Sequence, residues 1–419
     1  MNDSTVHVIS VNELYQSGGA KPSQSQRANE DAAKGHKDRQ FLGEERLTGS
    51  LARMTLSQLK TPPKIIFVSI GTNNLAKVGA YKQVEKRLKD MKFDVVSWDQ
   101  RDTTNARGGQ RQVSTSQAMP EVKKGQKAVW IILPGDPIDA KNPASLNVPD
   151  STLALVRDRV DKHGDGVMLL VPPEYDPKAA DERLLKEWGL VVDHTRVLLR
   201  SVLDNYGDKT ATNDHVVRSW PKDSMISKAL DDAKMRGWFR WASAIEFRPG
   251  RRENIEYWPI AQLKDDDIWG NFNTKEEPKE GKGKKIDFDP NIDRHAENNT
   301  FTIGYAALRK QGEIESRMVV VADHYWASDM FGVREVRDPT TNRTKSVNPY
   351  PGNHELFVNS VYWLAGLDEL IAASARTQDI RRIQDISDGD VSRLRNTLLF
   401  GLPFGVFVIG LSVWFTRRG

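Results

Sequence analysis

The sequence contains no cysteine in its 419 residues. This absence excludes disulfide bonds, metal sites built on thiolates and cysteine nucleophiles. Four catalytic and cofactor signatures are also missing: the phosphate-binding G-x-x-x-x-G-K-[ST], the dinucleotide-binding G-x-G-x-x-G, the hydrolase G-x-S-x-G and the zinc-binding H-E-x-x-H. We therefore expect no ATPase site in this chain, and no cofactor or metal.

The chain also lacks a strong excess of charge of either sign. It has 61 basic and 57 acidic residues, a net charge of +4, and no long basic run. Nucleic-acid-binding domains concentrate positive charge, so no nucleic-acid partner is expected. A hydrophobic content of 38% with 28% charged residues is typical of a globular protein with a solvated surface.

One long apolar run occurs, close to the C-terminal end. Residues 398–415 include no charged residue, and a helix of that length covers most of a ~30 Å hydrocarbon layer. Proline is tolerated in lipid, aromatic residues suit the membrane interface, and arginines suit the headgroups. We predict a transmembrane helix over 397–416, with a buried core helix as the alternative. The anchoring residues are Leu398, Pro403, Trp414, Arg417 and Arg418.

Arginines flank this run on both sides. Two follow it, and four precede it within the ~20 residues that the positive-inside rule counts: Arg381, Arg382, Arg393 and Arg395. This count favours a cytoplasmic domain, although large domains are translocated largely regardless of charge. The first ten residues, MNDSTVHVIS, carry no apolar run of the kind found in export signals. These residues alone leave the sidedness open.

Composition divides the rest of the chain. Residues 1–40 are polar and rich in small side chains, which is typical of a loop or disordered segment. An α/β domain is expected in two parts, 41–200 and 201–375, with a charged low-complexity loop inserted at 273–289. A juxtamembrane helix over 376–396 is expected to lead into the span.

Strand and helix patterns alternate along the first part of this domain. Short apolar runs bounded by Pro or Gly predict buried strands, and apolar residues at i, i+4 and i+7 predict helices. Strands are expected in 65–70, 93–98, 127–136, 167–173, 300–310 and 316–329, and helices in 43–59, 80–91, 150–166 and 352–371. The stretch 181–193 is expected to be a helix that runs into a short strand. The alternation predicts an open, mostly parallel sheet flanked by helices.

Two of these helices carry finer predictions. Asp150 or Ser151 is expected to cap the helix at 150–166, and glycines to end it. In the helix at 352–371, an apolar stripe is expected from residues spaced at i, i+4 and i+7: Phe357, Val361 and Leu364.

The ends of two predicted strands carry candidate binding residues. Ligands of open α/β sheets bind outside the carboxyl ends of the strands. The stretch IGTNN follows the strand at 65–70 and contains Gly71 and Asn73, although an ordinary βα turn also explains it. A working ligand site at this turn and a simple connection are therefore both open.

The stretch VVVADHYWASD ends a strand at Asp323, and Asn353 precedes the last helix. With His324 and His354, these residues are candidates for a polar cluster or a metal site, although their spacing forces no metal geometry. The interpretation that we favour is structural: Asp323 ties down a loop, and Asn353 caps the helix.

The following stretches, taken in this order, share a pattern with a known family: FLGEERLTGSLARMTLSQLKTPPKIIFVSIG, AYKQVEKRLKDMKFDVVSWD, KAVWIILPGDP, LALVRDRVDKHGDGVMLLVPP, RMVVVADHYWASD, GNHELFVNSVYWLAGLDELI and IRRIQDISDGDVSRLRNTLLFGLPFGVFVIGLSVWFTRRG. They resemble the GldG-type auxiliary proteins of ABC transport systems. The resemblance extends over most of residues 41–419, and it rests on the order of the stretches. One departure is the family's GHGE turn, which is IGTNN here.

This resemblance implies a class I glutamine amidotransferase-like, or flavodoxin-like, α/β fold without its catalytic apparatus. It also implies a bacterial protein of the cytoplasmic membrane, with a single C-terminal span and the domain outside the cytoplasm. The implied partners are an ABC-type permease, a separate ATPase subunit and the lipid bilayer. The resemblance therefore predicts a non-enzymatic auxiliary or substrate-binding subunit. The alternatives are a membrane-anchored hydrolase or transferase that uses the strand-end polar groups, and a structural membrane scaffold.

Overall fold

The computed structural model describes two short strands at 15–17 and 39–41 and then residues 61–70, 81–102, 113–115, 118–133, 148–172, 180–203, 209–248, 254–265, 267–272, 288–323, 325–329, 334–337, 344–347 and 350–371. Contacts divide the chain into two units, Met1–Gln378 and Asp379–Gly419, and every described residue belongs to the first. The helices predicted at 43–59, 376–396 and 397–416 lie outside the described residues. None of the described helices is long and apolar enough to cross a membrane.

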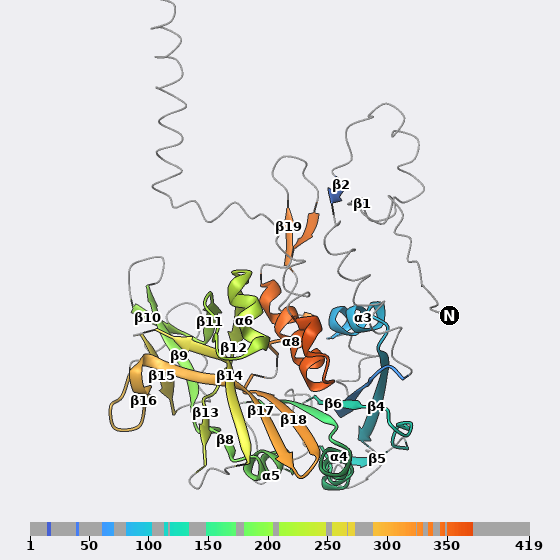
Figure 1. Cartoon of the computed structure of the whole chain (residues 1–419). Coiled ribbons are helices and arrows are strands. Elements are labelled where there is room, and N and C mark those ends of the chain that lie inside the picture. Colours follow the sequence, from blue (N-terminus) through green and yellow to red (C-terminus); the bar gives the residue numbers. More distant parts are fainter. Residues whose placement is uncertain are drawn as a thin grey trace, which may run out of the picture. The chain divides into compact units, whose positions relative to one another are not determined.

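An eight-stranded mixed sheet forms the centre of this unit (Figure 1). Its strands are β3 (Lys64–Ile70), β4 (Asp94–Asp102), β5 (Val113–Thr115), β6 (Ala128–Ile132), β7 (Gly166–Leu170), β14 (Ile255–Lys264), β17 (Thr300–Gln311) and β18 (Ile314–Val321). The spatial order is β14-β17-β18-β7-β6-β3-β4-β5. From β18 to β4 all neighbours are parallel, and the remaining pairs are antiparallel. The predicted α/β class with a large, mostly parallel sheet is confirmed.

Different helices cover the two faces of this sheet, because side chains alternate along each strand. Ile65 and Phe67 of β3 pack on the face covered by α3 and α8, and Ile66 and Val68 pack on the face covered by α4 and α5. A strand buried on both faces explains the apolar run 65–68 within β3. The helices are α3 (Lys82–Asp90), α4 (Asp150–His163), α5 (Ala180–Glu187) and α8 (Pro351–Leu364).

The two outer strands of the sheet are irregular or short. β14 contains Pro259, and its pairing with β17 shifts register between Pro259 and Ala261 and again between Ala261 and Gln262. Such shifts are β-bulges, which bend an edge strand. At the opposite edge, β5 has only three residues.

A long insertion between β7 and β18 adds further strands and one helix: β8 (Leu190–Val192), β9 (Val197–Leu203), β10 (Lys209–Thr212), β11 (Asp214–Val217), α6 (Met225–Asp232), β12 (Gly237–Arg240), β13 (Ile245–Phe247), β15 (Ile268–Asn271) and β16 (Arg294–His295). Four of them form a sheet in the order β10-β9-β15-β16, while β11 pairs with β12 and β8 with β13. The sequence pattern predicted only one of these elements, the strand now seen as β8. Apart from the seven-residue β9, the strands that were not predicted have only two to four residues, too few for a period to emerge.

Two isolated strand pairs and two short 3₁₀ helices complete the described elements: β1 (Tyr15–Ser17) with β2 (Arg39–Phe41), β19 (Arg334–Arg337) with β20 (Thr344–Val347), η3 (Glu297–Asn299) and η4 (Asp368–Leu370).

Helix α8 is buried on all sides. Each of its residues is buried, because α3, α6, β12 and the large sheet surround it. The predicted stripe of Phe357, Val361 and Leu364 is part of this buried set, and the helix has no solvated face. Its N-cap is Tyr350 and its first residue is Pro351, which needs no N–H partner there. The prediction that Asn353 caps this helix is wrong.

The cap predicted for α4 also differs from the structure. Pro149 occupies the N-cap position and no side chain makes the capping hydrogen bond, while Asp150 is the first helical residue. Gly164 ends the helix in the left-handed region at φ 66°, as the sequence predicted.

Candidate functional site

The candidate residues belong to the carboxyl edge of the parallel strands, where ligands of open α/β sheets bind. Gly71, Asn73 and His324 lie outside the described residues. Asp323 and Asn353 are described, and the structure brings them close to the same strand of the insertion, β12.

Asp323 follows the end of β18 and is completely buried. Its Oδ2 accepts a hydrogen bond from the backbone N–H of Arg240 at 2.7 Å, and its Oδ1 accepts one from the N–H of Tyr325 at 2.9 Å. Burial raises the pKa of this carboxyl to about 7, although these backbone hydrogen bonds favour the charged form. Asp323 therefore holds the 325–329 turn, as we favoured from the sequence, and also holds β12.

Asn353 is also buried, and its side-chain amide makes three hydrogen bonds. Oδ1 accepts from the N–H of Trp238 at 2.7 Å. Nδ2 donates to the carbonyl of Trp238 at 2.6 Å and to that of Trp326 at 2.5 Å. The amide thus uses both donors and one acceptor to join α8 to β12 and to the 325–329 turn.

These two side chains together complete one edge of β12. Trp238 and Arg240 are two residues apart, so their backbone groups point to the same edge of the strand. β11 pairs with β12 along its other edge. Asp323 and Asn353 therefore satisfy backbone groups that a neighbouring strand would otherwise bond. We call this pair of side chains the surrogate strand.

A second group of polar side chains lies where the 325–329 turn meets α3. The carboxylate of Asp329 accepts from the N–H of Gln83 at 3.1 Å and 3.3 Å, so it caps the N-terminus of α3. Burial raises the pKa of Asp329 to about 6. Burial, with Tyr325, Asp323 and Asp329 nearby, also raises the pKa of the Tyr81 hydroxyl. Four ionisable groups thus gather at this corner of the edge.

His354 lies beside this corner, with Nε2 3.9 Å from Oδ1 of Asp329. Burial and the neighbouring Arg87 lower the pKa of His354 to about 4. The imidazole is therefore neutral at pH 7, and its contact with Asp329 is not an ion pair. The next residue of α8 is Glu355, whose fully buried carboxylate forms an ion pair with Arg87 of α3.

In the described ranges, no three His, Asp or Glu side chains lie close enough together to hold a metal ion. The polar side chains at this edge instead accept from or donate to protein groups, and most of those partners are backbone amides and carbonyls.

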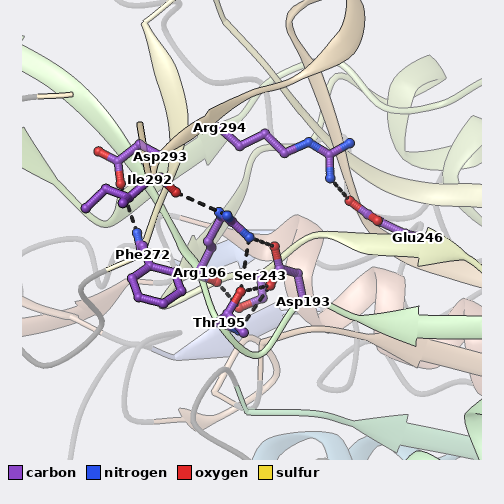
Figure 2. Close-up of polar contacts among 9 residues, drawn as sticks. All are labelled: Asp193, Thr195, Arg196, Ser243, Glu246, Phe272, Ile292, Asp293 and Arg294. Atoms are coloured by element: carbon purple, nitrogen blue, oxygen red, sulfur yellow. Dashed lines mark hydrogen bonds and ion pairs between the residues drawn. The ribbon is translucent and has the colours of Figure 1, made fainter. Parts of the chain in front are cut away.

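A separate polar cluster lies in the insertion (Figure 2). The carboxylate of Asp293 accepts from the N–H of Phe272 at 3.0 Å and from the N–H of Asp289 at 2.9 Å. These two donors flank residues 273–287, so one carboxylate joins the residues on either side of that segment. No motif in the sequence indicates this role for Asp293.

Arg196 stabilises the same cluster. Its guanidinium donates to the carbonyl of Ile292 at 3.1 Å and to Asp193 at 3.2 Å, and it lies 5.6 Å from the centre of the Phe272 ring (Figure 2). An ion pair between Arg294 and Glu246 joins β16 to β13. Since every one of these contacts connects elements of the insertion, we assign the cluster a structural role.

Sequence reasoning missed Tyr81, Arg87, Glu355 and the strand β12. A signal was present for Glu355, because a charged residue inside an apolar helical pattern needs a buried partner. No protein-family model matches this sequence, and a comparison with curated proteins finds no match either. The resemblance described above therefore rests on the quoted stretches alone.

Proposed function

We propose that this chain is a non-enzymatic, membrane-anchored auxiliary or substrate-binding subunit of an ABC-type transport or export system. The helix at 397–416 anchors it in the cytoplasmic membrane, and the α/β domain lies outside the cytoplasm. An ABC-type permease and a separate ATPase subunit are its partners. The ATPase must be separate, because the sequence has no phosphate-binding loop.

The observation that carries this proposal is the surrogate strand. At the edge where an α/β enzyme would place catalytic groups, Asp323 and Asn353 are bonded to the backbone of β12. Catalysis requires groups that can reach a substrate, and these two are committed to holding the insertion. A domain built in this way is better suited to binding than to chemistry.

The strand order supports the finer fold assignment. Numbered by their order in the chain, the parallel strands β3, β4, β6, β7 and β18 are arranged 2-1-3-4-5. This is the order of flavodoxin-like sheets, whose ligands bind where the order reverses, here between β3 and β6. We therefore propose the flavodoxin-like and amidotransferase-like architecture for this domain.

Co-purification from a mild detergent tests the proposal. The full chain is expected to bring down a polytopic permease and a P-loop ATPase. A chain ending at Asp390 is expected to lose both. A third form, in which 397–416 is replaced by an unrelated apolar helix, separates anchoring from recognition. If the full chain is recovered alone from its native membrane, the proposal is wrong.

A membrane-anchored hydrolase or transferase is the second candidate, and the corner around Asp329 favours it. A carboxyl with a pKa of about 6 close to a neutral histidine is an arrangement that acid–base catalysts use. Turnover of a small substrate by the full chain, abolished by Asp329→Asn and retained in Asp293→Asn, would support this candidate. An activity that Asp329→Asn leaves unchanged would exclude it.

A further inference from the structure

A lysine lies at the opposite edge of the large sheet, where the parallel strands begin. Lys127 immediately precedes β6. Its side chain shares the parity of Val129, so it points to the face of the sheet that α8 covers. There its Nζ lies 3.7 Å from the position that a Cβ would take at Gly366, which follows the end of α8. The amine is therefore placed between the start of a strand and the end of a helix.

The amine of Lys127 is set apart from its neighbours by its lack of a partner. In the described part of the chain it forms no ion pair and no side-chain hydrogen bond, although the residue is partly buried. Lys64, by contrast, forms an ion pair with Asp94, and Lys123 and Lys124 are exposed to water. Partial burial without a partner disfavours the charged form of an amine.

A second cation lies on the same side of the sheet. Arg317 of β18 forms an ion pair with Asp368 at 2.5 Å. Burial, followed by the positive charge of Arg317, lowers the pKa of the Lys127 amine. The carboxylates of Asp165, Glu315 and Asp368 act in the opposite direction, and their influence is weaker than those of burial and Arg317.

These surroundings favour a nucleophilic amine. Only the uncharged form of a lysine has a free lone pair, and lysines become reactive when they are desolvated or lie next to another cation. Lys127 meets both conditions. Its Nζ is not among the fully buried nitrogens that lack a partner, so solvent and small reagents reach it.

We propose that Lys127 is an acylation site, and that its amine reacts with acyl phosphates. The lone pair of Nζ attacks the acyl carbon and forms a C–N bond. The C–O bond to the phosphate breaks, inorganic phosphate leaves, and the amine proton passes to water. The product is an amide, which removes one positive charge beside the end of α8. This chemistry does not depend on the proposed transport role.

Competitive acetylation of the full chain, purified in mild detergent, tests the proposal. The protein is treated near pH 7 with a limiting amount of acetyl phosphate and digested with a protease that does not cleave at lysine. Mass spectrometry then gives the rate at each lysine. Lys127 is expected to react several-fold faster than its exposed neighbours Lys123 and Lys124. A rate equal to or below theirs would overturn the proposal.

The pH profile separates an activated amine from one that is merely accessible. The rate at Lys124 should rise about tenfold per pH unit below the ordinary pKa of a lysine, because the fraction of free amine rises in that way. The rate at Lys127 should level off at a lower pH. Identical profiles for the two residues would contradict the activation.

Variants assign the activation to its source. Arg317→Gln removes the neighbouring cation and releases Asp368, so it is expected to slow acetylation of Lys127 and to leave Lys124 unchanged. Arg317→Lys keeps the positive charge and is the matched control, which should retain most of the rate. If Arg317→Gln does not fold, the pH profile of the wild type decides the question. A folded Arg317→Gln variant with the wild-type rate at Lys127 would overturn the proposed activation.

Discussion

The two ends of the carboxyl edge use the same residue type in opposite ways. At β18, Asp323 accepts hydrogen bonds from the backbone N–H groups of Arg240 and Tyr325, whose positions are set by a strand and a turn. At β4, Asp99 accepts from the hydroxyls of Ser69 and Ser97. Backbone donors cannot turn toward a ligand without unfolding the element that carries them, whereas hydroxyls rotate in place. The two carboxylates therefore differ in their hydrogen-bond donors: those of Asp323 are fixed by the backbone, and those of Asp99 that are described here are side-chain hydroxyls. We call Ser69, Ser97 and Asp99 the β3–β4 group.

The comparison also involves proton affinity. Burial raises the pKa of Asp323 to about 7, so near neutrality this carboxyl is divided between its protonated and charged forms. The contribution of the β18 end of the edge to stability is therefore expected to depend on pH.

Asn353→Ala is expected to produce the largest loss of stability. The substitution removes three hydrogen bonds and leaves the buried N–H and carbonyl of Trp238 and the carbonyl of Trp326 without this partner. The free energy of unfolding should fall by about 3 kcal/mol or more. Urea denaturation measures it, with the exposed Asn291→Ala as the control. If the two variants were equally stable, the surrogate strand would contribute nothing to the fold.

The pH dependence of Asp323 is expected to be the next largest effect. Its folded pKa of about 7 lies above the ordinary pKa of 3.8 for an aspartate, so folding increases proton binding. The stability that the protonated form provides is complete below pH 3.8 and is lost as pH rises toward about 7. Relative to Asp323→Asn, the wild type should lose on the order of 1 kcal/mol per pH unit across this window.

Urea denaturation of both proteins at several pH values measures this difference, and subtraction removes the contribution of other titrating groups. A difference in the free energy of unfolding between wild type and variant that stays constant across the window would mean that Asp323 is charged throughout. The pKa of Asp323 would then not be raised by burial.

Ser69→Ala is expected to have the smallest effect on stability. Ser97 still donates to the same oxygen of Asp99, and the alanine suits the apolar face of β3. The free energy of unfolding should change by less than about 1 kcal/mol. Thermal or urea denaturation of Ser69→Ala and Asn353→Ala under the same conditions measures the difference in stability between the two variants. A loss as large as that of Asn353→Ala would show that the β3–β4 group is structural as well.

The large sheet could be predicted from the sequence, and the surrogate strand could not. Continuous apolar runs such as 65–70 predict strands buried on both faces, and their alternation with helices predicts parallel pairing. The partners of Asn353 and Asp323 lie 115 and 83 residues away in a four-residue strand. A strand of four residues is too short to show a period in the sequence, and no rule of residue spacing predicts that it lies next to α8.

The β3–β4 group also has a signal in the sequence. Ser69 is the one polar residue in the run 65–70, and Ser97 and Asp99 lie two residues apart at the end of the strand predicted at 93–98 and just beyond it. What the sequence does not provide is the register that places Ser69 opposite Asp99. That register depends on the packing of both strands against α3 and α8.

The irregular outer strands of the large sheet limit the ways in which other proteins can bind to this one. A proline with two register shifts in β14 interrupts the row of donors and acceptors that another strand would need, and the three-residue β5 gives almost no length for pairing. Strand addition, the route by which exposed sheets template fibres, is therefore unfavourable at both ends. A partner is expected to bind through helices, loops or side chains, and crowding of many copies should not join their large sheets edge to edge.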